Sequence, residues 1–297
     1  MSGERGAAPL ESLLVLAQYL LPHHALSRIV LRATRLRIRW WKNLLIRFVV
    51  RHYGVNLDEA LDPDPDAYPC FNAFFTRALR PDARPLDPDP NHFLCPVDGR
   101  VSEAGAIDDD RLLQAKGRHY RLDELLAGDP DTAARFRNGR FATLYLSPRD
   151  YHRIHMPCDG RLDHTLYVPG RLFSVAPHTV RRVPRLFARN ERLACLFETD
   201  AGPVALIAVG ALFVSAIETV WSGLETPPHG WRIRRRDYPA EGEGVVRLPR
   251  GAELGRFNMG STVIVLFPPG AATLDPAITA GAPVRMGQTL ARRAGPD

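Results

Sequence analysis

From Phe93 to the carboxyl terminus, frequent glycine and proline residues divide the chain into short apolar runs. The 297 residues include 23 glycines and 26 prolines, and both residue types interrupt helices. Short runs rich in β-branched and aromatic residues, bounded by turn residues, are typical of strands. This spacing favours a body built from many short strands over a helical bundle.

We therefore predict an α+β fold with a β-rich single body of short, mostly antiparallel strands. A few short helices interrupt the strands, and one of them follows Asp129-Pro130, a pair that suits a helix cap and a first helical turn. The predicted strands are residues 141–146, 193–198, 204–209, 212–218 and 262–267, and the predicted helices are residues 71–79, 122–126 and 132–137.

Residues 1–57 differ from the rest of the chain in charge, since no acidic residue lies between Glu11 and Asp58. The apolar run at residues 13–21 ends at Pro22. At about 1.5 Å per helical residue, it covers well under half of a hydrocarbon core of roughly 30 Å. We predict that this run does not span a bilayer.

The second half of this segment has the pattern of an amphipathic helix. Basic residues recur at intervals of four and three, and apolar residues follow a helical period. Tryptophan and basic residues on such a helix are typical of a segment that lies in a membrane interface. A helix that packs on the body and turns its charged side to solvent is the alternative. The basic positions are Arg28, Arg32, Arg35, Arg39 and Lys42, and the apolar ones are Trp41, Leu44, Leu45, Phe48 and Val49, with Trp40 at the border.

The net charge of +6 also favours a negatively charged partner. We predict an anionic membrane surface and no nucleic acid, because the chain contains no recognisable nucleic-acid-reading module. The four cysteines form no C-x-x-C pair and no dense framework, which indicates a reduced, cytoplasm-facing protein.

Three stretches contain residue types that could act on a hydroxyl group or a peptide bond. They contain Asp98, the pair His152 and His155, and the dipeptide Gly260-Ser261. Asp, His and Ser together provide a nucleophile, its base and the carboxylate that orients the base. Each stretch alone is also typical of an ordinary turn or bend. The two histidines could form half of a metal site, but no third His or Cys lies at ligand spacing, so we predict no metal.

Six segments, in order along the chain, resemble phosphatidylserine decarboxylases of the bacterial, membrane-associated type. The resemblance runs from about residue 10 to about residue 290. That family usually has Leu-Gly-Ser-Thr at its cleavage motif, and this chain has Met259-Gly260-Ser261-Thr262. Exchanging Leu for Met conserves volume and leaves the Gly-Ser bond intact. The segments are residues 71–79, 96–99, 151–157, 168–175, 187–192 and 257–267.

The resemblance implies an inactive proenzyme that cuts itself between Gly260 and Ser261. Ser261 would attack the carbonyl of Gly260, with His155 as the base and Asp98 holding the imidazole in the required tautomer. Elimination and hydrolysis would then convert Ser261 into a pyruvoyl group. The products would be residues 1–260, the beta chain, and residues 261–297, the alpha chain, which form a heterodimer. The number of heterodimers per assembly stays open.

The implied cofactor is therefore a covalent pyruvoyl group derived from Ser261. It would form a Schiff base with phosphatidylserine and accept the electrons released with CO₂, giving phosphatidylethanolamine. The resemblance assigns His152 to the decarboxylation step, as an acid or a substrate-orienting group. It also implies a peripheral enzyme on the cytoplasmic side of the cell (inner) membrane. In this interpretation residues 1–57 associate with the membrane and residues 58–297 form the catalytic domain.

Two functions of other kinds remain open from the residues alone. A lipid serine hydrolase would use Asp98, His155 and Ser261 in an intact chain. A non-catalytic membrane-binding domain would use Gly260-Ser261 only as a bend before a strand.

Overall fold

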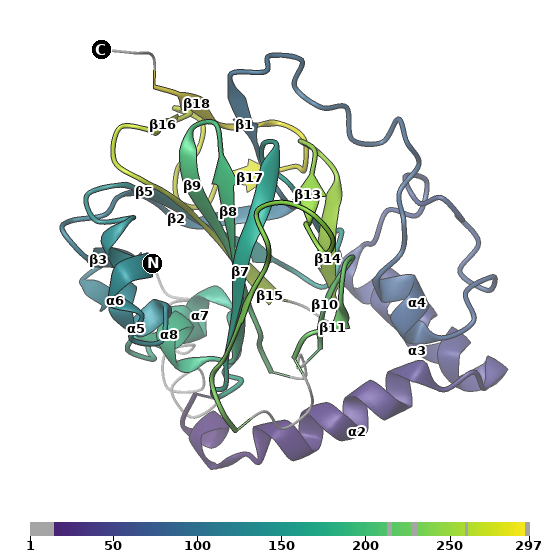
Figure 1. Cartoon of the computed structure of the whole chain (residues 1–297). Coiled ribbons are helices and arrows are strands. Elements are labelled where there is room, and N and C mark those ends of the chain that lie inside the picture. Colours follow the sequence, from purple (N-terminus) through teal and green to yellow (C-terminus); the bar gives the residue numbers. More distant parts are fainter. Residues whose placement is uncertain (1–14, 213–215, 227–230, 259–260, 295–297) are drawn as a thin grey trace, which may run out of the picture.

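The structure is a computed structural model that describes residues 15–212, 216–226, 231–258 and 261–294. A β-rich body packs against two longer helices that lie along one side of it (Figure 1). The predicted α+β class is confirmed, since paired strands are antiparallel throughout the named sheets.

The largest sheet has nine strands, and β15 lies at its centre. β15 (Ser261–Phe267) pairs with β5 (Arg140–Leu146) on one side and with β9 (Gly202–Val209) on the other. Residues 262–267 are all buried, which explains why this apolar run occupies the centre rather than an edge. The order is β12 (Arg234–Asp237), β7 (Gly160–Val168), β8 (Arg192–Thr199), β9, β15, β5, β2 (Gly99–Ala106) and β17 (Pro283–Val284), with β13 (Arg247–Leu248) paired to β7.

Three smaller sheets complete the described strands. The four-stranded sheet carries the segment with the two histidines, because His155 ends β6 and β6 pairs with β14. It runs in the order β11 (Gly223–Leu224), β10 (Ile217–Thr219), β14 (Glu253–Phe257) and β6 (Arg153–His155). The others are β1 (His92–Leu94), β18 (Thr289–Arg293) and β16 (Ala272–Leu274), and the pair β3 (Arg111–Ala115) and β4 (Arg118–Arg121).

Four short helices, α5 to α8, gather beside the large sheet (Figure 1). In α6, the side chain of Asp129 accepts a hydrogen bond from the backbone of Thr132 at 3.0 Å, as the sequence predicts for a cap. That helix begins at Pro130 and ends at Ala134, so the predicted range 132–137 begins and ends too late in the chain. The helices are α5 (Leu122–Leu125), α6 (Pro130–Ala134), α7 (Pro177–Val180) and α8 (Leu186–Arg189).

Two other predicted elements differ from the structure. The predicted helix 71–79 is α4 (Phe71–Phe75), which ends with Thr76 as its C-cap; Leu79 forms a β-bridge with Ala60 instead. The predicted strand 212–218 is present as β10 from Ile217 onward, and residues 213–215 lie outside the described residues.

The amino-terminal helices are α2 (His23–Arg35) and α3 (Arg39–Tyr53). The predicted basic stripe is not continuous, because the backbone is extended at Leu36 and Ile38. Lys42 is buried and its ammonium donates to the backbone oxygen of Asp66 at 2.9 Å, so it belongs to the interior. A helix that packs one face against the body buries some side chains that the helical period alone would assign to the outer surface.

The apolar face predicted for this segment is divided between two directions. Trp41, Leu45 and Val49 line a cavity between the helices and the body. Trp40, Leu44 and Phe48 lie on the outside, with 68%, 59% and 58% of their surface exposed. Among the helices in the described ranges, none is long and apolar enough to cross a membrane.

Candidate active site

The sequence-predicted cleavage site lies at the start of the central strand. The backbone of Ser261 pairs with Leu146, the last residue of β5. Gly260 and the side chain of Ser261 fall outside the described residues. After Leu146 the chain enters the loop Ser147–Tyr151, which leads directly to His152. The sheet therefore fixes where this loop lies relative to the backbone of Ser261.

Gly99 brings Asp98 to the same end of β5. A Cβ atom at Gly99 would lie 2.2 Å from the carbonyl oxygen of Tyr145, so β2 approaches β5 too closely for any other residue. The backbone at Gly99 also has φ +154. The Asp-Gly pair thus serves a close strand contact rather than a free turn.

Asp98 is buried and its carboxylate is bound by Arg84. Nε of Arg84 lies 2.9 Å and 3.1 Å from its two oxygens, and the backbone N–H of Met286 donates to it at 2.9 Å. Arg84 also binds Glu59 at 2.7 Å. Burial opposes the charge of Arg84, but the hydrogen bonds to both carboxylates outweigh it and raise its pKa. The resulting cluster holds Asp98 in one orientation.

His155 is oriented by two other groups. Its Nδ1 lies 2.8 Å from the carbonyl oxygen of Gly251, and its Nε2 lies 3.0 Å from the hydroxyl of Tyr151. A carbonyl only accepts hydrogen bonds, so Nδ1 carries the hydrogen and Nε2 is the basic nitrogen. Burial raises the pKa of Tyr151 to about 12, so its hydroxyl stays protonated and donates to Nε2.

The expected partnership of Asp98 and His155 is therefore indirect in this structure. Among the described residues, the hydrogen bonds of Asp98 go to Arg84 and Met286, and those of His155 go to Gly251 and Tyr151. Burial lowers the pKa of His155, and the nearby charge of Asp98 acts in the opposite direction. The negative charge of Asp98 favours the protonated form of His155. The carbonyl of Gly251 fixes which ring nitrogen of His155 carries the hydrogen.

His152 has different surroundings. It is fully buried and stacks on Phe75, with ring centroids 4.0 Å apart. Its Nε2 lies 3.1 Å from the carbonyl oxygen of Ser147, so Nε2 carries the hydrogen. Nδ1 is buried and has no hydrogen-bond partner among the residues that the structure describes. Burial, with the nearby charge of Arg77, lowers the pKa of His152 to about 3. The neutral ring thus offers one free acceptor.

Two cavities meet at the loop that precedes His152. An apolar cavity of about 540 Å³ lies between α2, α3 and the body, and it reaches Phe75, Leu146 and Pro148. A polar cavity of about 280 Å³ is lined by Asp98 and Tyr151, among others. Within the described ranges, no group of three or more His, Cys, Asp or Glu side chains could hold a metal ion.

Several residues of this site were not singled out from the sequence. Arg77 lies within the segment 71–79 and Tyr151 within 151–157, so the resemblance covered them without giving them roles. Arg84 and Glu59 lie in stretches with no distinguishing pattern. The carbonyl of Gly251 could not have been found, because a backbone group leaves no signal in the residue types.

Comparison with known proteins confirms the resemblance. The family model described as phosphatidylserine decarboxylase matches residues 71–292, and a second model, described as PSD, matches residues 13–54.

Three similar relatives are each named phosphatidylserine decarboxylase proenzyme. The one from Xanthomonas axonopodis pv. citri is 56% identical over 282 residues, which cover 95% of this chain and 99% of the relative. The one from Bordetella bronchiseptica is 54% identical over 281 residues, covering 95% and 94%. The one from Ectopseudomonas mendocina is 53% identical over 280 residues, covering 94% and 98%. This chain belongs to the phosphatidylserine decarboxylase family.

Proposed function

We propose that this protein is the self-cleaving precursor of a pyruvoyl-dependent enzyme that converts phosphatidylserine to phosphatidylethanolamine and CO₂. The observation that carries the proposal is the position of Ser261, which begins the central strand in a chain that belongs to this family. The relatives carry the word proenzyme in their names, which supports processing of this chain as well. The intact-chain lipid hydrolase and the non-catalytic domain are not favoured by these relatives.

Processing would begin with attack of the Ser261 hydroxyl on the carbonyl carbon of Gly260. Nε2 of His155 would accept the hydroxyl proton once the Tyr151 hydroxyl gives up its hydrogen bond to that nitrogen, and the Gly260–Ser261 amide bond would give way to an ester. Removal of the Cα proton then releases the large chain as a carboxylate and leaves dehydroalanine, which water hydrolyses with loss of ammonia. Well-oriented intramolecular groups reach effective molarities of about 10⁵ M or more, so no external protease is required.

The described residues fit a pyruvoyl group at position 261. The backbone there pairs with Leu146, which lines the apolar cavity, and the buried Nδ1 of His152 has no hydrogen-bond partner among the residues that the structure describes. The pyruvoyl carbonyl would supply an electron sink for the carboxylate that leaves as CO₂. His152 would orient the substrate by accepting a hydrogen bond at Nδ1. Phe75 and the Ser147 carbonyl hold the ring for this role.

The two chains would remain together as a heterodimer after cleavage. Residues 261–297 contribute β15, β16, β17 and β18. β15 pairs on both sides with strands of the large chain, and β17 and β18 pair with β2 and β1. These ladders support association without the peptide bond.

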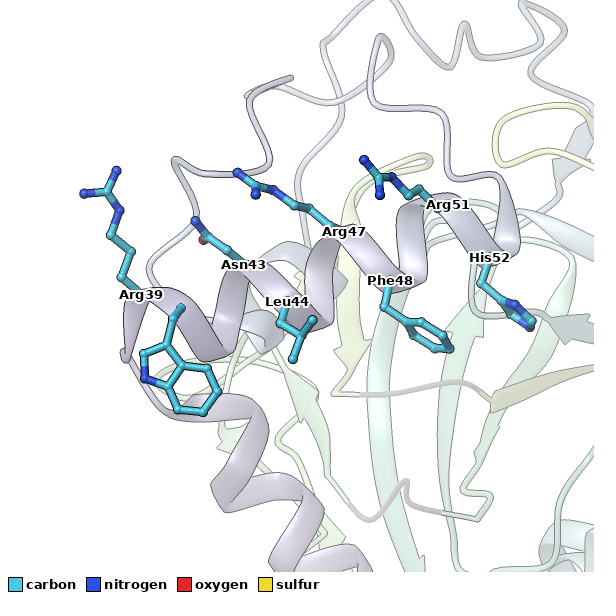
Figure 2. Close-up of a pocket in the computed structure, with 8 residues that line it drawn as sticks. Arg39, Asn43, Leu44, Arg47, Phe48, Arg51 and His52 are labelled. Carbon is cyan, nitrogen blue, oxygen red and sulfur yellow. The ribbon is translucent and has the colours of Figure 1, made fainter.

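The outer surface of α3 supports attachment to a membrane. Figure 2 shows Leu44, Phe48 and His52 on one side of the helix and Arg47 and Arg51 on the other. An apolar row beside a basic row suits a helix that lies in the lipid interface, with the basic groups near the phosphates. This arrangement supports residues 1–57 as the membrane segment. We further propose residues 58–297 as the catalytic domain and a peripheral position on the cytoplasmic side of the cell membrane.

Replacing Leu44 and Phe48 together with aspartate is expected to abolish sedimentation with vesicles that contain anionic lipid. Both side chains are mostly exposed, so the change adds charge mainly to the outer row, although Phe48 also borders the apolar cavity. Leu61→Asp is the matched control, because Leu61 is 63% exposed and lies in the connection between α3 and α4. Unchanged sedimentation of the double variant would place the lipid contact elsewhere.

An intact-mass measurement of the purified wild-type protein tests the proposed function. We expect two chains, residues 1–260 and residues 261–297, with the shorter one carrying a pyruvoyl group at its amino terminus. The same sample is expected to release CO₂ from carboxyl-labelled phosphatidylserine. A chain that stays whole after prolonged incubation, or a sample that releases fatty acid instead of CO₂, would contradict the proposal.

A further inference from the structure

Arg77, just beyond α4, is a buried cation with unused hydrogen-bond donors. Only 4% of its surface is exposed. Its Nη2 donates to the carbonyl oxygen of Arg149 at 3.1 Å, and its guanidinium lies 5.5 Å from the ring centroid of Phe74. Nε and Nη1 are buried and have no hydrogen-bond partner among the residues described. A guanidinium has five N–H groups, and these two nitrogens carry three of them.

The carboxylates around Arg77 are already bound to other cations. Arg77 lines the polar cavity of about 280 Å³ together with three more arginines and three acidic residues. Arg84 binds both Glu59 and Asp98. Asp150 lies 3.7 Å from Arg149, and Glu59 also lies 3.7 Å from Arg285. Within the described structure, no ion pair involves Arg77. The other charged lining residues are Glu59, Arg84, Asp98, Arg149, Asp150 and Arg285.

This cation also lies near the residue assigned to decarboxylation. The charge of Arg77 contributes to the lowered pKa of His152, so the two side chains interact. A buried charge without a paired group is costly unless hydrogen bonds or an opposite charge compensate it. Burial opposes the charge of Arg77 more strongly than the nearby carboxylates favour it, since its pKa is lowered. The local structure is therefore suited to an added anion.

We propose that Arg77 binds the phosphodiester of the substrate headgroup. This inference rests on the proposed function, and it adds a substrate-binding residue to that site. Arginine suits this role because its planar, permanently charged group donates several hydrogen bonds to phosphate oxygens.

The chemistry of the reaction favours the phosphodiester over the substrate carboxylate. The carboxylate must leave as neutral CO₂, and an arginine bound to it would stabilise the reactant more than the transition state. The phosphodiester keeps its charge throughout the reaction. A cation bound there lowers the KM without opposing the chemical step.

The positions of the two cavities suit an amphiphilic substrate. Consecutive residues line different cavities at two places, Pro148 and Arg149 in the loop and Tyr53 and Gly54 at the end of α3. The apolar cavity can accept acyl carbon atoms, while Arg77 lies on the polar side. His152 follows the same loop, so the reacting end and the phosphodiester can be held by neighbouring groups.

Binding of glycerophosphoethanolamine, measured by titration calorimetry on the processed heterodimer, tests this assignment. This probe has the phosphodiester but no carboxylate. We expect the wild-type protein to bind it and Arg77→Gln to bind it about ten- to hundredfold more weakly, as expected for the loss of a charge-assisted hydrogen bond. Arg80→Gln is the matched control, because Arg80 is exposed, pairs with Asp82 at 3.5 Å and does not line the cavity. We expect its affinity to be unchanged.

Free L-serine provides the second arm, because it has the carboxylate and no phosphate. Arg77→Gln is expected to leave unchanged the inhibition of phosphatidylserine decarboxylation by L-serine. If this inhibition were lost while glycerophosphoethanolamine bound normally, Arg77 would hold the carboxylate and the proposal would be wrong. Equal binding of glycerophosphoethanolamine to wild type and Arg77→Gln would also overturn it.

Steady-state kinetics with short-chain phosphatidylserine distinguish a loss of substrate binding from a general disturbance of the structure. We expect Arg77→Gln to raise the KM about ten- to hundredfold with kcat changed by less than about threefold. Arg77→Lys keeps the charge and should recover part of the loss, which covers the case in which Arg77→Gln does not fold. A fall in kcat alone in both variants would contradict the assignment. A wild-type protein that releases no CO₂ would instead contradict the proposed function, whatever the calorimetry shows.

Discussion

Replacing His155 with alanine is expected to leave the chain in one piece, at the full mass of 33.1 kDa. The reason is the tautomer inferred from the hydrogen bonds, in which the Gly251 carbonyl accepts from Nδ1–H and Nε2 is left as the base. Loss of a general base typically slows a step by about 10²- to 10⁴-fold. Intact-mass spectra taken over several days should show the precursor where the wild-type protein shows two chains.

His119→Ala is the control for this experiment, because His119 is an exposed histidine on β4. It should be cut as fast as the wild-type protein. The His155 variant is also expected to release no CO₂, since the pyruvoyl group would not form. Cleavage of His155→Ala at the wild-type rate would remove this residue from the processing reaction.

Replacing His152 with alanine is expected to separate processing from catalysis. The variant should be cut normally, because the basic Nε2 and the tautomer of His155 depend on Tyr151 and Gly251 and not on His152. Its release of CO₂ should fall by about 10²-fold, since the Nδ1 acceptor that orients the substrate is lost. Intact mass and CO₂ release from the same sample give both results.

The same assignment predicts the pH dependence of the wild-type rate. Burial lowers the pKa of His152 to about 3, so its ring becomes protonated only as the pH falls toward that value. Between about pH 5 and pH 8 the ring stays neutral, and kcat should show no inflection from this group. If His152→Ala also failed to be cut, the division of roles between the two histidines would be wrong.

The strands of the large sheet could be predicted because burial leaves a strong pattern in the sequence. The runs at residues 141–146, 193–198, 204–209 and 262–267 all became strands of one sheet. Their order could not be predicted, since a strand from the end of the chain lies between two strands from its middle. That order depends on contacts between distant residues, which short-range patterns do not report.

The amino-terminal segment shows where a helical period misleads. The spacing from Arg28 to Lys42 suggested one continuous stripe, but the extended residues between α2 and α3 rotate the second helix relative to the first. Lys42 then bonds Asp66, a residue outside the segment. The period predicts which side chains share a face of one helix. It does not predict which side the body will cover.

The candidate site was predictable in its residue types and not in its contacts. Asp98, His152 and His155 could be named from the sequence and the family resemblance. Their partners, Arg84, Phe75 and the Gly251 carbonyl, lie in other parts of the chain or carry no distinctive side-chain signal. Only the folded chain brings them together.

The central position of β15 also bears on how the mature protein can be made. Folding of the precursor is a unimolecular event, because the strand and both of its neighbours belong to one chain. If the bond before Ser261 is cut as we propose, the same strand can return to its place only by collision with a separate molecule, so its recovery depends on concentration. In the uncut precursor, β15 and both of its neighbours are held in one chain, so the sheet assembles within that chain. Under the proposed reaction each molecule passes through this state only once.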